Sequence, residues 1–410
     1  MRKVGIGVIG CGMIAHTYLE NLAKRFGVIK IVGVADLIEE KAKWASERYG
    51  AKIMTNEEIY ECPEIEIVVN LTNVWRHYEV TRAALEHGKH VYSEKMIAEN
   101  FDRAKELYDL AEEKGVMFAC APDTFLGGGY QTCRKLIDDG FIGVPFAVNA
   151  TIIRSYLPSG PAPALNNVLV DGGTIPYDMG GYYIHALQQM FGPVRRVAGF
   201  SKNTPKYWSN PANPKYGEKL DIRSSNIVVT SLEFECGVLG TLTAGDIGVM
   251  SMAEIPGIWV YGTEGTLFCP DPNTFGGPVK LLKPGAENFV EMPMTHGYHG
   301  DERSFNFGGQ QEQDFMIRMW EKSRRGVGVA DMAWSIVNER PARISNEMGL
   351  HTIEILHGVD VCTETGKVYE MTTRNPRPVA LRAGFMGNDC EAVFDDKWDE
   401  NIDTTPWWCK

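Results

Sequence analysis

The chain has 410 residues, of which 44% are hydrophobic and 23% charged, an ordinary composition for a globular protein that excludes disorder and fibrous repeats. Forty-one basic against fifty-three acidic residues give a net charge of −12, so no basic surplus serves a general nucleic-acid binder. The nine cysteines form no C-x-x-C pair and are odd in number, which favours reduced thiols in a cytoplasmic protein.

The first residues resemble a signal peptide only superficially. Arg2 and Lys3 precede an apolar run, but Gly7, Gly10 and Gly12 interrupt it. No other stretch approaches the roughly 18 apolar residues that a membrane span needs. We therefore expect a cytoplasmic protein with no membrane partner and no nucleic-acid partner.

The first 120 residues alternate between strand and helix signals. This order predicts a doubly wound parallel sheet of the α/β class, because strands separated by helices of this length connect through right-handed crossovers. The expected strands are Lys3–Ile9, Ile29–Ala35, Ile65–Leu71, His90–Ser93 and Val116–Ala121, and the expected helices are Ile14–Phe26, Ile38–Tyr49, Trp75–His87 and Phe101–Lys114.

From about Phe146 the pattern changes to longer alternating runs with few helices between them. It predicts an α+β domain with a large, mostly antiparallel open sheet. We place the boundary between the two domains after residue 123, giving domains of residues 1–123 and 124–410. The expected helices here are Tyr130–Asp139, Val329–Val337 and Asn346–Glu364, and the expected strands are Phe146–Ile153, Ser225–Phe234, Leu239–Ala244, Ile258–Tyr261 and Val279–Leu282.

The first strand runs into residues 10–15, Gly-Cys-Gly-Met-Ile-Ala, a G-x-G-x-x-A motif between strand and helix. Gly10 permits the tight turn, Gly12 leaves room for a pyrophosphate, and the helix N-terminus offers N–H groups to the phosphates. Asp36 ends the second strand, where a carboxylate accepts hydrogen bonds from the adenosine ribose and repels a 2′-phosphate. No arginine follows Asp36, so the motif predicts NAD in preference to NADP.

A second cofactor contact is expected where the third long strand ends. Ligands of open α/β sheets bind beyond the carboxyl ends of the strands, so Thr72 and Asn73 should face the cofactor. Met13 and Ile14 at the glycine-rich turn belong to the same set. Alternatively, Asn73 is an N-cap and Met13 a core residue.

Several motifs of the chain resemble those of the Gfo/Idh/MocA oxidoreductases, which include glucose–fructose oxidoreductase and inositol dehydrogenase. They are the glycine-rich turn, Gly88-Lys-His-Val91 leading into Glu94-Lys95, the Arg134–Gly140 helix, Asp178-Met-Gly-Gly-Tyr182 and Gly326–Asp331. The resemblance covers residues 3 to 380 or so.

This resemblance implies an N-terminal Rossmann domain that binds NAD and a C-terminal domain that binds substrate. It implies oxidation or reduction of a secondary hydroxyl of a sugar, sugar derivative or cyclitol, a small polyhydroxylated molecule. It also implies a homo-oligomer, a dimer or tetramer, formed through the C-terminal sheet. His77, in the first turn of the helix after Asn73, stands where the family often has a histidine near the nicotinamide; alternatively it is a surface histidine.

The sequence departs from the family pattern at several positions. Met96 stands where Glu-Lys-Pro has its proline, and a cis bond before methionine is costly. In the pattern D-x-G-x-H-x-x-D, Tyr182 replaces the usual histidine, as in the glucose–fructose oxidoreductase branch, and His185 replaces the last acid. Phe125 aligns with an arginine that is common after the sixth strand.

Hydride transfer from a carbinol carbon needs a base for the hydroxyl proton and a group that holds the developing alkoxide. Lys95 meets this need if desolvation and the charge of the nicotinamide lower its pKa; alternatively it is a solvated lysine paired with Glu94. We expect Tyr182 or Lys95 to move the proton. Asp178 would orient the lysine or a sugar hydroxyl, and His185 would hold a second hydroxyl or relay the proton.

These residues are expected on one helix. Asp178, Tyr182, His185 and Gln189 follow one another at steps of four, three and four, so they share a face. The adjacent glycines Gly180 and Gly181 each cost about 1 kcal/mol of helix stability, which a closely approaching ligand would explain. A stripe that faces solvent is the alternative.

One segment of the chain has the donor types of a metal site. It contains His296, His299 and Asp301, but the proposed reaction needs no metal and we expect none. Two other functions fit the family: an NAD-dependent enzyme that cleaves glycosides by transient ring-carbon oxidation and elimination, and a non-catalytic sugar-sensing regulator. The presence of Lys95 and Tyr182 argues against the regulator.

Overall fold

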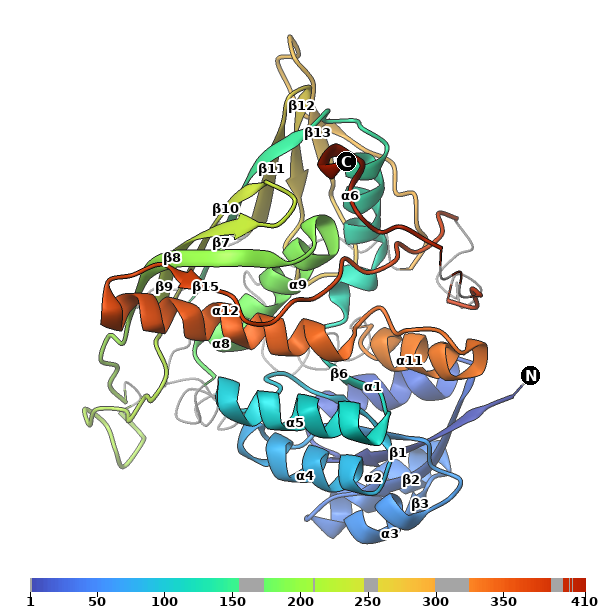
Figure 1. Ribbon diagram of the computed structural model, residues 1–410. Helices are drawn as coiled ribbons and strands as arrows, with labels where there is room; N and C mark the ends of the chain where they lie inside the picture. Colours follow the sequence, from blue (N-terminus) through green and yellow to red (C-terminus); the bar gives the residue numbers. More distant parts are fainter. Residues whose placement is uncertain are drawn as a thin grey trace.

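The computed structural model describes residues 2–154, 173–208, 211–246, 257–298, 324–384, 394–397, 399 and 401–410. Two β-sheets are stacked, with helices α11 (Val327–Asn338) and α12 (Asn346–Thr365) running between them in the view of Figure 1. Within the described residues, no helix is both long enough and apolar enough to cross a membrane.

The first sheet has six parallel strands in the order β3-β2-β1-β4-β5-β6. This order reverses beside β1, the arrangement of doubly wound nucleotide-binding sheets, so the predicted α/β fold of this half is confirmed. The strands are β1 (Val4–Ile9), β2 (Ile29–Ala35), β3 (Lys52–Ile53), β4 (Ile67–Asn70), β5 (His90–Ser93) and β6 (Phe118–Cys120). The helices are α1 (Met13–Lys24), α2 (Glu39–Tyr49), α3 (Asn56–Glu61), α4 (Val74–Glu86) and α5 (Phe101–Lys114).

The second sheet has nine strands in the order β14-β13-β12-β11-β7-β10-β9-β8-β15, and only the β7–β10 pair is parallel among them. The prediction of a large, mostly antiparallel sheet is therefore confirmed. Its strands are β7 (Pro145–Arg154), β8 (Val194–Lys202), β9 (Ile227–Phe234), β10 (Leu239–Asp246), β11 (Gly257–Gly262), β12 (Gly265–Cys269), β13 (Lys280–Leu282), β14 (Val290–Glu291) and β15 (Tyr369–Glu370).

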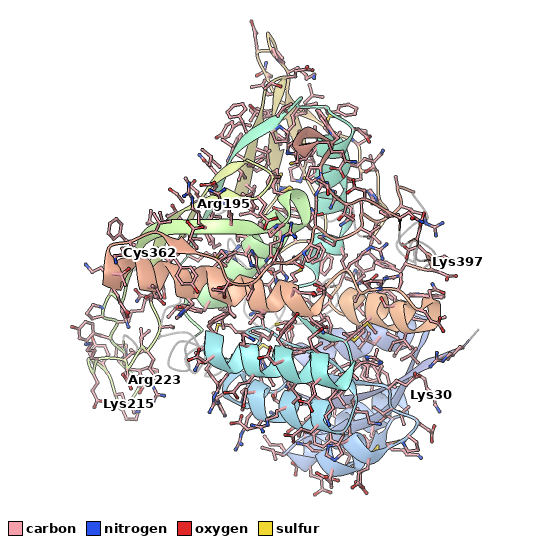
Figure 2. The ribbon with its side chains drawn as sticks, in the orientation of Figure 1. Lys30, Arg195, Lys215, Arg223, Cys362 and Lys397 are labelled. Carbon is pink, nitrogen blue, oxygen red and sulfur yellow. The ribbon has the colours of Figure 1, made fainter. Side chains whose placement is uncertain are left out.

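Burial alternates along the central strands of this sheet, as expected when helices cover one face only. The covering helices are α6 (Gly128–Asp138), α8 (Ile175–Asp178), α9 (Gly180–Phe191) and α12, and two short 3-10 helices, Thr124–Leu126 and Trp407–Cys409, complete the described set. Between β8 and β9 a long arm carries Lys215 and Arg223 away from the sheet, at the lower left of Figure 2.

Some elements were not predicted, for a local reason. In β8, Arg195 and Arg196 are adjacent and the exposed Phe200 interrupts the order of apolar and polar residues, which weakens the hydrophobic alternation that marks a strand. Helix α3 is short, but Thr55 and Glu58 form a capping box at its N-terminus, a signal that was available in the sequence.

The end of the chain returns to the first sheet. The side chain of Asn346, at the start of α12, accepts a hydrogen bond from the backbone N–H of Phe118 in β6 (2.7 Å). The side chain of Asn21 in α1 donates to the carbonyl of Arg325 just before α11 (2.8 Å). Residues far apart in the sequence therefore meet beside the parallel sheet.

Candidate active site

The turn between β1 and α1 has the geometry of a phosphate cradle. Gly10 has a φ of +97°, and a Cβ there would lie 2.6 Å from the carbonyl of Leu71, so only glycine fits without strain. A Cβ on Gly12 would meet nothing within 4 Å, so the space above the turn is open. No side chain caps the N-terminus of α1, which leaves its N–H groups for an anion. Met13, at the first position of the helix, is partly exposed, and Ile14 is half-buried.

Asp36 follows β2, where the ribose of a dinucleotide would be bound. One carboxylate oxygen accepts a hydrogen bond from the N–H of Cys11 (2.7 Å), and the other accepts from the N–H of Ile38 (2.8 Å). These bonds orient the carboxylate next to the glycine-rich turn. Together with the open space above Gly12, its acceptor chemistry fits an adenine dinucleotide.

His77 is buried, so it is not a surface histidine. Its Nδ1 lies 2.6 Å from the carbonyl oxygen of Met96, and its Nε2 lies 3.0 Å from that of Thr72. Burial lowers its pKa, although both carbonyls oppose this effect. His77 thus ties the turn after β4 to the segment after β5. Asn73 is the N-cap residue of α4, but its side chain makes no capping hydrogen bond.

Glu94 and Lys95 follow β5 directly. The carboxylate of Glu94 accepts hydrogen bonds from the hydroxyl of Tyr18 (2.8 Å) and from the N–H of Lys95 (3.1 Å). The peptide bond between Lys95 and Met96 is cis, even though the second residue is methionine and not proline.

Lys95 reaches across to the second half of the chain. Its Nζ forms an ion pair with Asp178 Oδ1 and lies 5.8 Å from the centroid of the Tyr182 ring. The side chains of Lys95 and Asp178 are 20% and 13% exposed, so the pair is shielded but accessible. Three of the four predicted catalytic residues therefore meet at one point between the sheets.

The direction of the pKa shift of Lys95 differs from the expectation. Burial lowers this pKa, as expected, but Asp178, Tyr182 and Glu94 outweigh burial and raise it above the ordinary lysine value. Lys95 is therefore an ammonium at neutral pH in the protein alone. The ion pair explains the error, because it joins residues 83 positions apart in the sequence.

The predicted single-helix stripe is wrong in part. Helix α8 ends at Asp178, and α9 begins at Gly180 after a break at Met179, where the two glycines weaken the helix. His185 and Gln189 point inward and bond to the carbonyls of Pro122 (3.0 Å) and Tyr130 (3.2 Å). They are buried and do not form a solvent-facing stripe.

His185 lies behind the Lys95–Asp178 pair. Together with Lys95, Pro122 and Thr352 it lines a cavity of about 30 Å³, room for about one water molecule. Burial lowers the pKa of His185 to about 4, although the Pro122 carbonyl opposes it, so the imidazole is neutral at pH 7.

An arginine that the sequence analysis did not single out completes the site. The guanidinium carbon of Arg325 lies 4.9 Å from the centroid of the Tyr182 ring, and its Nη1 lies 4.0 Å from the carboxylate of Asp123. Phe125, which aligns with the family arginine, is buried and packs edge-on against His185. A guanidinium is thus present but comes from residue 325, a contact that no sequence periodicity indicates.

The histidine-rich segment shows no metal site in the described part of the chain. His296 is buried and bonds to the Leu381 carbonyl (3.0 Å) and the Thr295 hydroxyl (2.9 Å). His299 and Asp301 lie outside the described residues. Among the residues that are described, no group of three His, Cys, Asp or Glu side chains is placed to hold a metal ion.

Comparisons with protein families match both halves of the chain. The Gfo/Idh/MocA family, described as "Oxidoreductase family, NAD-binding Rossmann fold", matches residues 4–121. The Gfo/Idh/MocA C-terminal domain matches residues 130–268.

Individual proteins resemble this chain at low sequence identity. The inositol 2-dehydrogenase/D-chiro-inositol 3-dehydrogenase of Lactiplantibacillus plantarum is 30% identical over 155 residues, 35% of this chain and 42% of that protein. The scyllo-inositol 2-dehydrogenase (NAD+) of Bacillus subtilis is 24% identical over 275 residues, 65% of this chain and 74% of that protein. An oxidoreductase from Agrobacterium radiobacter, solved with NAD+, L-tartaric acid and magnesium, superposes with a TM-score of 0.66 at 14% identity, covering 90% of this chain and 98% of that one.

Proposed function

Because the chain belongs to the Gfo/Idh/MocA oxidoreductase family, we propose that it is an NAD-dependent dehydrogenase of a sugar, sugar derivative or cyclitol. One observation carries this proposal: Lys95, at the carboxyl edge of the dinucleotide-binding sheet, pairs with Asp178 and lies over Tyr182 from the second domain. An ammonium, a carboxylate and a phenol there have the functional groups that oxidation of a carbinol requires.

The cofactor would be held by the residues of the cradle. They are Gly10, Gly12, Met13 and Ile14 at the pyrophosphate, Asp36 at the ribose, and Thr72, Asn73, His77, Glu94 and Lys95 toward the nicotinamide. When bound, NAD supplies the acceptor for a hydride from a carbinol carbon. The carboxylate of Asp36 disfavours a 2′-phosphate, so we propose NAD as the physiological cofactor.

We assign the catalytic roles from charge. Lys95 is charged, so it donates a hydrogen bond to the substrate oxygen and stabilises the developing alkoxide. Asp178 holds the ammonium in place. The Tyr182 hydroxyl, which bonds to no described residue, exchanges the proton with the substrate oxygen. His185 is neutral and bonds to Pro122, so we assign it to positioning the wall behind the site.

A substrate panel tests this function. Inositols, aldoses and glycosides are incubated with the protein and NAD, and NADH is followed by its absorbance. We expect NADH to accumulate with at least one polyol or sugar. Lys95→Ala and Tyr182→Phe should each lower kcat by roughly 100-fold or more while NADH binding is retained.

The same panel separates the alternatives. Release of a free aglycone without net NADH would indicate the glycoside-cleaving reaction. Tight NAD binding without turnover on any compound would indicate a sensor. Full activity of both variants would remove Lys95 and Tyr182 from the mechanism.

A further inference from the structure

Arg325 occupies an unusual place for a buried cation. Its side chain is 11% exposed, and its guanidinium lies between two aromatic rings, 4.9 Å from the centroid of Tyr182 and 5.8 Å from that of Phe275. Aromatic faces attract a guanidinium, but they do not neutralise its charge.

The polar partners of Arg325 orient its guanidinium but do not fully neutralise its charge. Nη2 donates to Asn273 (2.6 Å), and the carboxylate of Asp123 is 4.0 Å from Nη1. Asp123 is itself occupied by the N–H groups of Gly326 (2.9 Å) and Gly328 (3.1 Å). Nη1 is buried and bonds to no described residue. The nearby carboxylates, Asp123 and Glu94, form no close ion pair with this desolvated cation, so a further negative charge beside it would be stabilised.

Tyr182 is the group that can acquire such a charge. Two cations, Arg325 and Lys95, face its ring, and the nearby carboxylates are Asp178 and Glu94. Asp178 is paired with the Lys95 ammonium, and Glu94 accepts a hydrogen bond from the Tyr18 hydroxyl but keeps its charge. Of the two cations that face the phenol, Lys95 therefore forms a close ion pair, whereas Arg325 lies 4.0 Å from the carboxylate of Asp123.

We propose that Arg325 is a positioning residue that stabilises the phenolate of Tyr182 whenever this side chain exchanges a proton with the substrate. This inference rests on the proposed function. In the oxidative direction the phenolate takes the hydroxyl proton, and in the reductive direction it remains after the phenol has donated.

The shifts in the pKa of Tyr182 agree with this geometry. Burial raises the pKa of Tyr182 above the ordinary value, and Arg325, followed by Lys95, offsets only part of this increase. Without Arg325 the pKa would be higher still, so the phenol would stay protonated over a wider pH range.

The test follows the ionisation of the Tyr182 side chain. 3-Fluorotyrosine is placed at position 182 of the full chain, and its ionisation is followed by ¹⁹F NMR with NAD present. Arg325→Gln should raise the midpoint by about one pH unit, whereas Arg325→Lys should restore most of the shift. Asp123→Asn should lower the midpoint, because it removes the carboxylate beside the guanidinium. The matched control is Arg377→Gln, which removes another buried arginine that lies over an aromatic ring, Trp408, and should leave the midpoint unchanged.

Kinetics give the second readout. With an active substrate, the pH profile of kcat/KM in the oxidative direction should move with the NMR midpoint, so Arg325→Gln loses roughly tenfold at neutral pH and recovers at higher pH. An unchanged midpoint in folded Arg325→Gln, or in Asp123→Asn if the former does not fold, would overturn the inference. A shifted midpoint in a protein that turns over no substrate would retain the role of Arg325 in the ionisation and overturn only the proposed function.

Discussion

Asp36 combines a structural and a binding property in one carboxylate. Each of its oxygens already accepts one backbone hydrogen bond, from Cys11 and from Ile38. A carboxylate oxygen has more than one lone pair, so both can also accept from ribose hydroxyls. The negative charge that serves these bonds is the same charge that repels a 2′-phosphate.

Replacement of Asp36 by asparagine should therefore change cofactor preference more than folding. Asparagine keeps one acceptor for the backbone but loses the charge and one acceptor for the ribose. We expect Asp36→Asn to bind NADH roughly tenfold to 100-fold more weakly, from the loss of a charged hydrogen bond, and to bind NADPH more tightly than the wild type. Fluorescence titration with both cofactors measures this without a substrate. Glu39→Ala, an exposed acid in the first turn of α2, is the control and should keep the NAD preference.

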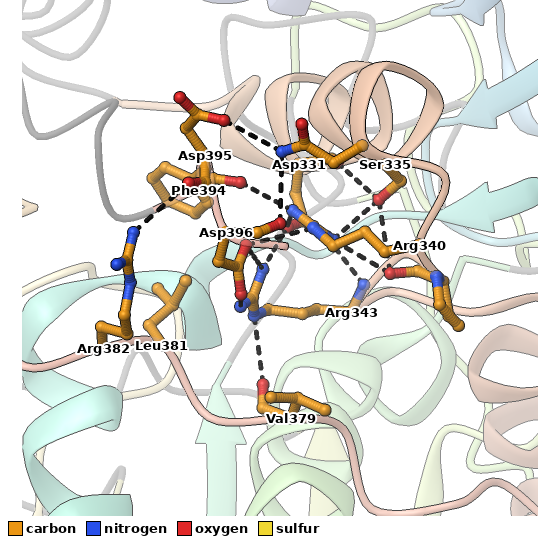
Figure 3. A network of polar contacts seen from close by, with 12 residues as sticks. Asp331, Ser335, Arg340, Arg343, Val379, Leu381, Arg382, Phe394, Asp395 and Asp396 are labelled. Carbon is orange, nitrogen blue, oxygen red and sulfur yellow. Dashed lines mark hydrogen bonds and ion pairs between the residues drawn. The ribbon is translucent and has the colours of Figure 1, made fainter. Parts of the chain in front are cut away.

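Among the elements, α11 depends on a buried charge network (Figure 3). The carboxylate of Asp331 in α11 accepts from Arg340 (2.7 Å) and from Arg343 (2.7 Å), and Asp396 lies on the other side of both guanidiniums. Asp331 is fully buried, and both arginines are 3% exposed. The network joins α11 to the loop that precedes α12. It therefore fixes the orientation of the two helices relative to each other.

We expect Asp331→Asn to lower the free energy of unfolding by roughly 3–5 kcal/mol at pH 7, because it removes the fully buried carboxylate and leaves the two buried guanidiniums with Asp396 alone. Burial raises the pKa of Asp331, but Arg340 and Arg343 lower it more, so the folded pKa lies below the ordinary value. The stabilisation is therefore complete at neutral pH and is lost as the pH falls below about 4 through the folded pKa.

Urea unfolding at several pH values checks this prediction. The difference between the variant and the wild type should be largest at neutral pH and should narrow in acid. Glu235→Gln, which breaks the more exposed pair with Arg374, serves as control and should cost at most about 1 kcal/mol. Equal losses in the two variants would mean that the network contributes nothing beyond an ordinary surface pair.

At the scale of the molecule, the uncovered face of the nine-stranded sheet exposes large apolar side chains. Phe200 pairs in register with Val229 on one side of this face, and Trp259 pairs with Phe268 on the other. Phe200 is 73% exposed and Val229 is 50% exposed. Because large apolar side chains exposed on one face are typical of association surfaces, we propose that this face forms the interface of a dimer or tetramer.

Phe200→Glu should disrupt this assembly. A carboxylate that replaces an apolar side chain in the interface is desolvated on association, so we expect at least a tenfold increase in the dissociation constant. Light scattering after size exclusion measures the mass over a range of concentrations. Ile53→Glu, at an exposed apolar position on β3 of the other sheet, should leave the mass unchanged. A wild-type protein that is monomeric at high concentration would contradict the proposal.

The elements that were predicted well share a local cause. Helix α12 was expected at Asn346–Glu364 and is observed at Asn346–Thr365. The prediction succeeded because the spacing of its apolar residues and the glycine that ends it are local features of the sequence. The glycine-rich turn was also predicted from local sequence, because the positive φ of Gly10 depends on the strand and the helix that adjoin it. Short edge strands such as β15 carry no such pattern and were missed.

The amino-acid sequence by itself determined the parallel sheet, the cofactor cradle and the identity of Lys95, Asp178 and Tyr182 as candidates, because periodicity, turn chemistry and motif spacing act over short distances. Only the tertiary structure decided the charge of Lys95, the inward direction of His185 and the arrival of Arg325 at Tyr182. The physical reason is that a pKa and a contact depend on which groups share a desolvated space, and the chain brings those groups together from more than 80 positions apart.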